Sequence, residues 1–326
     1  MESLVNKKIL ITGGTGFIGS NLIRSLIESG NKDIHIFIRN NSNIWRIKDI
    51  LEKLNVHYVD ILDKEKVGKI IAEIEPDIIF HSAAYGATNR NQNDHELLVK
   101  TNFIGTINIL DSSIKKGFEA FINVGSSSEY GFINKPFEEN DLPNPIDTYG
   151  VTKLASTIYC RMVSITQDLP IVTLRLFSPY GYYEDASRLI PYLIISMLKN
   201  GTITLNSPYA KRDFVFIEDV IDAFLKTAKR IDKIQRGTII NIGSGIDITV
   251  MEVFNLLKEL LNYQKIPIIK ENPIERDKLP IWRANINNAL KIIGWEPKYN
   301  LRDGLFKDVE WFKKNLELYE VKKYEQ

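Results

Sequence analysis

The stretch that decides the fold is Thr12-Gly13-Gly14-Thr15-Gly16-Phe17-Ile18-Gly19, which follows the apolar run Ile9-Leu10-Ile11 and opens an amphipathic segment. This pattern predicts a strand, a glycine-rich turn and the start of a helix. Gly13 would allow the tight turn, Gly16 would let a pyrophosphate approach bare backbone, and Gly19 would let the helix pack closely on the sheet. The anion would rest on N–H groups at the positive end of the helix. The stretch therefore predicts a dinucleotide-binding fold in preference to a plain glycine-rich turn.

The length and hydrophobic content of the chain are sufficient for a large buried core. The 326 residues are 44% hydrophobic, which suits a chain that divides into two lobes. Lys and Arg number 42 against 41 Asp and Glu, so the net charge of +1 does not indicate binding to nucleic acid or to a membrane surface. The single cysteine, Cys160, is expected to be a small buried side chain in a helix. With neither a charged leader nor a long apolar run, we expect a protein of the cytoplasm.

Short apolar runs alternate with helical patterns along most of the chain, as in a parallel sheet covered on both faces. We predict an α/β fold: a doubly wound Rossmann sheet in residues 1–175 and about 215–247, and a smaller mixed α/β substrate-binding lobe in about 176–214 and 248–326. The predicted strands are 8–12, 34–38, 56–59, 77–81, 119–124, 171–176 and 238–242, and the predicted helices are 17–29, 64–74, 96–116, 149–167, 187–199, 218–229, 250–261 and 305–315.

The end of the second strand bears on the choice of cofactor. An NAD-binding protein of this fold places an acidic side chain there for the ribose hydroxyls. This chain has Arg39 there and no carboxylate until Asp49. Arg39 could hold a 2′-phosphate, which favours NADP(H), although an ordinary solvated arginine is the alternative. Asp60 could lie beside the adenine or, alternatively, help to start the next helix as a capping carboxylate.

A second pattern is Tyr149-Gly150-Val151-Thr152-Lys153. Tyr149 and Lys153 are four residues apart, so on a helix they share a face, and the ammonium can lower the pKa of the phenol. Such a tyrosine can exchange a proton with a carbonyl or alcohol oxygen. The polar run Gly125-Ser126-Ser127-Ser128 ends a predicted strand, where ligands bind in parallel sheets. A similar pair, Tyr319 and Lys323, is interpreted as a solvated helix face.

Together these motifs resemble the extended short-chain dehydrogenase/reductases that act on nucleotide sugars, the NAD-dependent epimerase/dehydratase family. The resemblance extends over essentially the whole chain. Its other matching pieces are 81–84, 101–106, 125–131, 174–177, 212–220, 241–245 and 294–297.

The resemblance implies a nicotinamide cofactor under one lobe, a nucleoside-diphosphate sugar under the other, and hydride transfer at a ring carbon, usually C4. Tyr149 would be the acid/base, Lys153 would tune it and hold the nicotinamide ribose, and Ser126 would bind the reacting oxygen. The implied cofactor-binding residues are Gly13, Thr15, Gly16, Phe17, Ile18, Gly19, Arg39, Asp60, Ile61, Ala83, Ala84, Asn102 and Lys153, and the implied substrate-binding residues are Ser127, Ser128, Ser178, Arg212 and Arg276.

The resemblance also implies a homodimer, in which helices 96–116 and 149–167 pack against their copies. Leu97, Leu98, Ile158 and Met162 are the apolar side chains on these helices that we expect to be exposed in one chain. The alternative is that they complete the core of the monomer.

Departures from the family pattern bear on the reaction. Sugar 4,6-dehydratases carry Asp-Glu or Ser-Glu where this chain has Ser127 and Ser128, so dehydration is disfavoured. Glu129 is one position out of register and, on a strand, would face the other side. Ser178 replaces an Asn that commonly contacts substrate. The run Gly-Ser-Ser-Ser-Glu-Tyr-Gly resembles reductases of nucleotide-linked 4-keto-6-deoxy sugars.

The resulting prediction is an NADP(H)-dependent reductase of the 4-keto group of a nucleotide-linked 4-keto-6-deoxyhexose. The alternative is an NAD-dependent nucleotide-sugar 4-epimerase. A third possibility, a non-catalytic dinucleotide-binding regulator, would not need Tyr149 and Lys153. His81 is expected to be a packed strand residue, no metal site is predicted, and Trp282, Trp295 and Trp311 are expected to pack the lobes.

Overall fold

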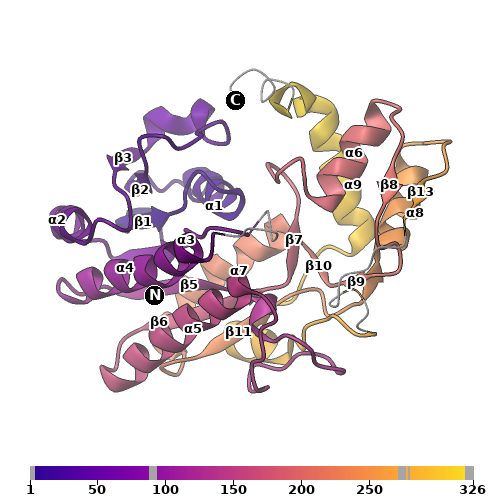
Figure 1. Cartoon of the computed structure of the whole chain (residues 1–326). Helices are drawn as coiled ribbons and strands as arrows, with labels where there is room; N and C mark the ends of the chain where they lie inside the picture. Colours follow the sequence, from indigo (N-terminus) through magenta and orange to yellow (C-terminus); the bar gives the residue numbers. More distant parts are fainter. Residues whose placement is uncertain (1–3, 88–93, 271–276, 278–279, 320–326) are drawn as a thin grey trace.

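The computed structural model describes residues 4–87, 94–270, 277 and 280–319. At its centre lies a sheet of seven strands in the order β11-β6-β5-β4-β1-β2-β3 (Figure 1). All neighbouring strands in it are parallel. The strands are β1 (Ile9–Thr12), β2 (Ile34–Ile38), β3 (Asn55–Tyr58), β4 (Ile78–His81), β5 (Ala120–Ser126), β6 (Ile171–Leu176) and β11 (Ile239–Ile242). The predicted Rossmann sheet is therefore confirmed.

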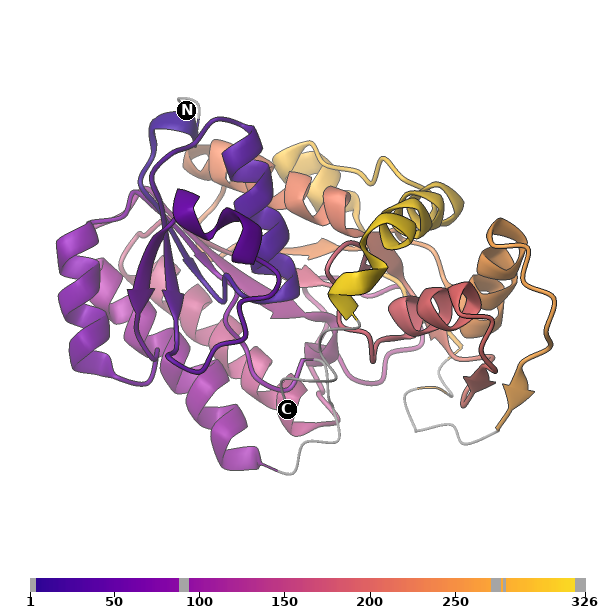
Figure 2. The same cartoon turned by 90° about the horizontal axis from the view of Figure 1, so that it is seen from above.

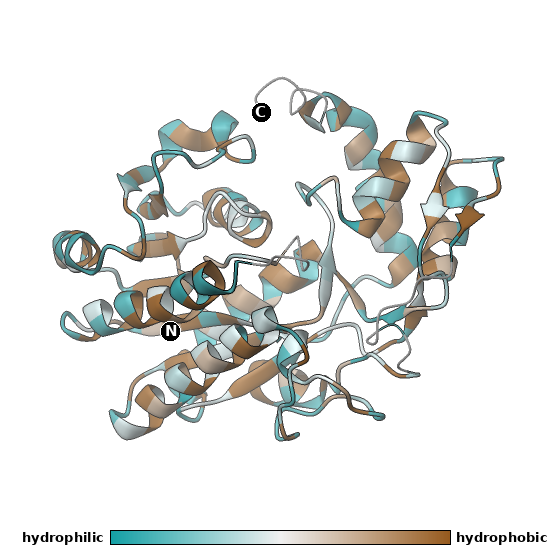
Figure 3. Cartoon of the chain, in the orientation of Figure 1, coloured by the Kyte–Doolittle hydropathy of each residue, from teal (hydrophilic) through white to brown (hydrophobic). Residues whose placement is uncertain are grey.

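Helices cover both faces of this sheet (Figures 1 and 2). On β1, Ile9 and Ile11 belong to the core shared with α1 and α7, whereas Leu10 belongs to the core shared with α2, α4 and α5. The strands are therefore hydrophobic along their length, while the helices expose a hydrophilic side (Figure 3). These helices are α1 (Phe17–Glu28), α2 (Lys64–Ile74), α4 (Gly105–Ile114), α5 (Thr148–Thr166) and α7 (Ile217–Arg230).

The strand order reverses between β1 and β4, and this switch point creates the opening in which such sheets bind ligands. Two connections meet there, the glycine turn after β1 and the segment Ser82–Ala84 after β4. Gly13 has φ +73°, and a Cβ on it would lie 2.6 Å from the backbone N of Ala83. Only glycine fits this position, because the two connections touch backbone to backbone.

The remaining helices and short strands gather at one end of the molecule and are called the C-terminal cluster here (Figure 1). Its helices are α6 (Leu189–Leu198), α8 (Val250–Leu260) and α9 (Leu301–Asn315). Its strand pairs are β8 (Thr204–Leu205) with β13 (Ile268–Ile269) and β9 (Lys211–Arg212) with β12 (Ile248–Thr249). A further parallel pair, β7 (Ser178–Tyr180) and β10 (Phe214–Phe216), joins the cluster to the sheet.

The predicted continuous helix 96–116 is wrong in one respect. The segment consists of α3 (His95–Val99), a π-helical turn over Lys100–Ile104, and α4. The π-turn places Asn102 inward, where its side chain bonds the backbone of Tyr85. Leu98, expected to be exposed, is only 2% exposed because it packs beside Gly86.

Tyr319 is also placed differently from the prediction. It is 9% exposed, its ring meets Trp45 edge-on and packs at a tilt against Phe312, and its hydroxyl donates a hydrogen bond to the carbonyl of Glu184 at 2.9 Å. The predicted solvated face is therefore wrong at this residue, because the C-terminal segment folds back onto the loop that carries Glu184. Its proposed partner Lys323 lies outside the described residues.

Several predicted packing residues are confirmed. Cys160 is buried in α5, and Trp295 is fully buried, with its indole N–H donating to the carbonyl of Asp219. His81 is buried between the hydroxyls of Thr12 and Thr106, and burial lowers the pKa of its imidazole to about 3. His81 is therefore a neutral strand residue. Across the described segments, no helix combines the length and apolarity needed to cross a membrane.

Candidate active site

A cleft of about 530 Å³ opens between the carboxyl ends of the sheet strands and the C-terminal cluster. Both parts of the chain contribute to its walls. The predicted site residues that line it are Gly13, Gly16, Phe17, Ile18, Gly19, Ala84, Ser126, Ser127, Tyr149, Lys153, Ser178 and Arg212. The fold therefore brings the predicted cofactor, catalytic and substrate residues together in one place.

The glycine turn forms one end of the cleft. Gly16 is the N-cap of α1, with no side-chain hydrogen bond to the first turn, so the N–H groups there are open to an anion. A Cβ on Gly19 would lie 2.4 Å from the carbonyl oxygen of Gly13, and a Cβ on Gly16 would lie 3.1 Å from the same oxygen. The bare backbone and the helix N-terminus fit the diphosphate of a dinucleotide.

Tyr149 and Lys153 lie on the first two turns of α5 and face the cleft. The helix begins at Asp147, whose carboxylate accepts a hydrogen bond from the N–H of Gly150 at 2.6 Å. A Cβ on Gly150 would lie 2.5 Å from the carbonyl oxygen of Ser128, so glycine lets this helix approach the serine turn. Tyr149 is 9% exposed and Lys153 only 2%.

The ammonium of Lys153 lies in a desolvated site. Burial lowers its pKa, and the nearby carboxylate of Glu129 opposes that effect. The remaining positive charge lies one helical turn from the Tyr149 phenol, on the same face of α5. This arrangement favours a phenol that can give up its proton.

The serine run adopts a different geometry from the one predicted. Strand β5 ends at Ser126, and the next three residues form a 3₁₀ turn. Within it, the hydroxyl of Ser126 accepts a hydrogen bond from the N–H of Ser128 at 3.2 Å. The prediction that Glu129 lies on a strand and faces away is wrong, because the turn directs it inward. Its carboxylate accepts hydrogen bonds from Ser126 N at 2.8 Å and Arg175 Nε at 2.7 Å.

Arg212, on β9 of the C-terminal cluster, lines the cleft. Its guanidinium is 5.8 Å from the Trp282 ring centroid and pairs with the carboxylate of Asp277. Trp282 is 2% exposed, lines the cleft, and packs against Phe137 in a small aromatic cluster with Tyr130 and Phe177. Arg276 lies outside the described residues.

The other described residues of the predicted site do not line the cleft: Thr15, Arg39, Asp60, Ile61, Ala83, Asn102 and Ser128. Arg39 is exposed at the end of β2, and its N–H donates to the Ser42 hydroxyl at 2.9 Å. Asp60 is exposed as well. The capping alternative for Asp60 is wrong, because the N-cap of α2 is Asp63.

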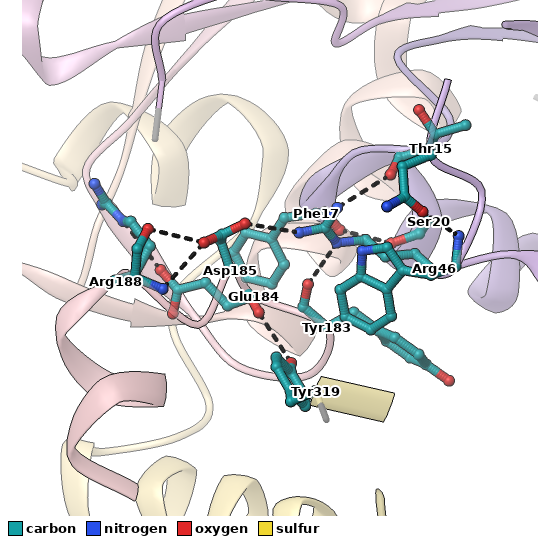
Figure 4. A network of polar contacts seen from close by, with 12 residues as sticks. Thr15, Phe17, Ser20, Arg46, Tyr183, Glu184, Asp185, Arg188 and Tyr319 are labelled. Atoms are coloured by element: carbon teal, nitrogen blue, oxygen red, sulfur yellow. Dashed lines mark hydrogen bonds and ion pairs between the residues drawn. The ribbon is translucent and has the colours of Figure 1, made fainter. Parts of the chain in front are cut away.

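Sequence reasoning missed four charged residues that line the cleft: Arg46, Glu184, Asp185 and Arg188. Glu184 is buried, and burial raises the pKa of its carboxyl to about 7, although Arg188 Nε lies 3.3 Å from one of its oxygens. Figure 4 shows these residues in one polar network with Thr15 and Tyr319. Arg46 follows Arg39 on the same connection after β2, which could have marked it as a candidate site residue. Only the fold shows which of the two arginines enters the cleft.

Groups of three or more His, Cys, Asp or Glu side chains placed to hold a metal ion are not found among the described residues.

The strand order, the glycine turn and the Tyr149–Lys153 helix define an α/β protein of the short-chain dehydrogenase/reductase type. Residues 9–243 match the sequence profile described as the NAD dependent epimerase/dehydratase family. The chain therefore belongs to that family.

Relatives in this family carry different activities. The chain is 30% identical to a putative UDP-glucose 4-epimerase of Methanocaldococcus jannaschii over 94% of this chain and 99% of that protein. It is 28% identical to the UDP-glucose 4-epimerase of Thermotoga maritima solved with UDP-glucose, with a TM-score of 0.85, 94% of this chain covered and 99% of that one. It is 25% identical to the dTDP-glucose 4,6-dehydratase of Bacillus anthracis solved with NAD, with a TM-score of 0.84, over 96% of this chain and 98% of that one.

Proposed function

We propose that this enzyme is an NADP(H)-dependent reductase of the 4-keto group of a nucleotide-linked 4-keto-6-deoxyhexose. The observation that carries the proposal is the set of side chains beside Tyr149. Ser126, Tyr149 and Lys153 line the cleft together, and serines occupy both places where the dehydratases carry their acid and base. The nearby carboxylate, Glu129, is 0% exposed and is paired with Arg175. The site can donate a proton and is poorly equipped to eliminate water.

Each residue has a part in that chemistry. The hydride for the carbonyl carbon would come from a reduced nicotinamide held beside Tyr149 and Lys153. Tyr149 donates its phenolic proton to the carbonyl oxygen, and Lys153 stabilises the resulting phenolate. The hydroxyl of Ser126 donates a hydrogen bond to the same oxygen, which favours the charge that develops there. Lys153 also holds the nicotinamide ribose.

The preference for NADP(H) rests on the connection after β2. Arg39 offers a cation there, and the first carboxylate along the connection, Asp49, is engaged by Arg24 through two hydrogen bonds of 2.6 and 2.9 Å. Asp49 is therefore an arginine-bound carboxylate ten positions beyond Arg39, and no acidic side chain stands at the end of β2 itself. Asp60 and Ile61 would lie beside the adenine, and Ala83, Ala84 and Asn102 would support the cofactor from the floor of the cleft.

The nucleotide sugar would lie on the other side of the cleft, in a lobe formed by about 176–214 and 248–326. Arg212 would grip its diphosphate together with Arg276, because guanidinium groups bind phosphate oxygens in a forked geometry. Ser127, Ser128 and Ser178 would contact the sugar. Arg212 would then exchange its carboxylate partner Asp277 for a phosphate.

A 4-epimerase is the second candidate, favoured by the names of the relatives in Methanocaldococcus jannaschii and Thermotoga maritima. An epimerase regenerates its NAD in each turnover, whereas a reductase consumes one NADPH for each sugar. The third possibility, a non-catalytic regulator, is disfavoured by the pairing of Tyr149 with Lys153 in the cleft.

We also propose a homodimer in the cytoplasm. Apolar side chains recur along one exposed face of α5, where Val151, Ile158, Met162 and Ile165 are 45–54% exposed. Val99 and Ile104, on the neighbouring α3 and π-turn, are 42% and 40% exposed. Such a band suits burial against a second copy about a two-fold axis.

The test is to mix the purified protein with NADPH and a panel of nucleotide-linked 4-keto-6-deoxyhexoses while following NADPH absorbance. The reductase proposal expects one NADPH to be oxidised for each sugar reduced, and expects little NAD to remain bound through purification. Interconversion of UDP-glucose and UDP-galactose without added cofactor, with NAD released on denaturation, would favour the epimerase instead.

A further inference from the structure

The side chain of Arg46 crosses from the connection after β2 to a loop of the substrate side. Its Nε donates a hydrogen bond to the carbonyl of Tyr183 at 2.6 Å, and its Nη1 lies 3.4 Å from the carbonyl of Thr15, within the glycine turn (Figure 4). Arg46 also lines the cleft, together with Gly16 and Phe17. One guanidinium therefore touches the glycine turn, the cleft and the loop 183–185.

The charge of Arg46 is offset by the Asp185 carboxylate and by Glu184, and its guanidinium lies 4.6 Å from the Trp45 ring centroid. Its ion pair with Asp185 is long, with 3.9 Å between Nη2 and the carboxylate, and the arginine side chain is 12% exposed. Arg24 offers a contrast on the same side of the molecule, because Asp49 holds it through two short hydrogen bonds. A buried cation with a distant counter-charge costs free energy, which a bound anion would recover.

We propose that Arg46 is a cofactor-binding residue that contacts the diphosphate bridge of the dinucleotide. The glycine turn and the first N–H groups of α1 are where that diphosphate would bind, and Arg46 touches this same turn at Thr15. A guanidinium adds a charge-assisted hydrogen bond that the backbone cannot supply. Because Arg46 also holds the Tyr183 carbonyl, it connects the cofactor to the loop that carries Glu184.

Arg46 is assigned to the diphosphate and Arg39 to the 2′-phosphate because of their positions. Arg39 is at the end of β2, where the adenosine ribose lies in this fold, and it does not line the described cleft. Arg46 contacts the glycine turn instead. The assignment rests on the proposed function only in that the cleft binds a nicotinamide dinucleotide, so it holds for a reductase and an epimerase alike.

The experiment measures binding by calorimetric titration, with no turnover. Arg46→Gln should lower the affinities for NADPH and NADH by the same factor, roughly ten- to a hundredfold. The ratio of the two affinities should therefore be unchanged. Arg46→Lys should recover part of the loss, since it keeps the charge without the fork. Adenosine 2′-monophosphate, which has the 2′-phosphate but no 5′-phosphate, should bind Arg46→Gln as well as it binds the unmodified protein.

Tyr319→Phe is the matched control. It removes the hydrogen bond that holds the same loop at Glu184 from the other side, and Tyr319 is not among the residues lining the cleft. Cofactor affinity in this variant should change by less than about twofold, since no phosphate ligand is lost. Thermal unfolding shows whether each variant is folded. If Arg46→Gln does not fold, the comparison with the unmodified protein uses Arg46→Lys instead.

Three results would overturn the proposal: unchanged cofactor binding in a folded Arg46 variant, an equal loss of cofactor affinity in Tyr319→Phe, or an equal loss of affinity for adenosine 2′-monophosphate. The last result would assign Arg46 to the adenosine end. A negative reductase assay would leave this binding test intact, because cofactor affinity is measured without a sugar. Failure of Arg46 and failure of the proposed reaction are therefore distinguishable.

Discussion

The carboxylate of Glu129 and the guanidinium of Arg175 form an ion pair of 2.7 Å in which neither side chain is more than 1% exposed. The other oxygen of the carboxylate accepts hydrogen bonds from Ser126 N and from the Thr157 hydroxyl. One buried carboxylate thus joins the end of β5, strand β6 and helix α5. The serine turn and the helix that carries Tyr149 are held at a fixed spacing by this group.

Glu129→Gln should destabilise the fold by about 3–5 kcal/mol, because it leaves the Arg175 cation buried without a counter-charge. Chemical denaturation of the variant and the unmodified protein measures the difference. Glu119→Gln is the control, since it breaks the more exposed pair with Lys7 and should cost at most about 1 kcal/mol. Equal costs for the two substitutions would contradict the role assigned to the buried pair.

Tyr149→Phe should slow turnover by roughly 10²- to 10⁴-fold while leaving cofactor affinity nearly unchanged, because only the transferred proton is lost. Lys153→Met should slow turnover and also lower cofactor affinity, since Lys153 is proposed to tune the phenol and to hold the cofactor ribose. Single-turnover rates and cofactor titrations separate the two effects. Near-normal turnover of Tyr149→Phe in a chemistry-limited assay would remove Tyr149 from its proposed role.

Glu184 makes stability depend on pH. Burial raises the pKa of its carboxyl to about 7 from an ordinary 4.5. The unfolded chain loses this proton first, so Glu184 costs no stability below about pH 4.5 and an increasing amount up to about pH 7. Glu184→Gln removes the cost and should raise stability relative to the unmodified protein by about 2–4 kcal/mol more at about pH 8 than at about pH 4.

Denaturation curves at these two pH values test this dependence. Glu310→Gln, at an exposed carboxylate paired with Lys313, is the control and should change the pH dependence little. Parallel stability–pH curves for Glu184→Gln and the unmodified protein would contradict the raised pKa, because they would show that Glu184 has the same pKa in the folded and unfolded states.

Arg39→Asp should remove most of the preference for NADPH over NADH. A charge-assisted contact to the 2′-phosphate is worth about 1.5–3 kcal/mol, or roughly ten- to a hundredfold in affinity, and an aspartate would repel that phosphate. Titration of both cofactors against both proteins measures the ratio. Equal or tighter binding of NADH to the unmodified protein would rule out NADP(H) as the preferred cofactor.

Light scattering at micromolar concentration should give a mass of about twice 37.4 kDa. Ile158→Asp should shift the protein toward the monomer, because a carboxylate would be buried in the proposed interface. Phe306→Asp is the control on α9, since Phe306 is 54% exposed but lies away from α5. A monomeric mass for the unmodified protein would refute the dimer.

Local patterns predicted the sheet and the catalytic helix correctly. The glycine turn could be predicted from local order alone, because a strand, a glycine-rich run and a helix follow one another in the sequence. Tyr149 and Lys153 could be placed on one face because a helix repeats every ~3.6 residues. Short apolar runs marked the strands because both faces of a parallel sheet are buried. Such features are fixed by neighbours in the sequence, so the sequence alone reveals them.

Contacts between distant residues account for what was missed. The π-turn at Asn102 depends on the backbone of Tyr85, and the inward direction of Glu129 depends on Arg175. Arg46 enters the cleft beside Tyr183, which is 137 positions away in the chain. No periodic pattern in the sequence predicts these contacts, because each depends on which segments the tertiary fold brings together.

Asn102 couples two segments that are distant in the sequence. Its side chain bonds both backbone groups of Tyr85, in the segment after β4, and also the hydroxyl of Thr152, on the helix of Tyr149. One buried amide therefore joins the two segments, and a substitution at Asn102 would be felt in both of them at once.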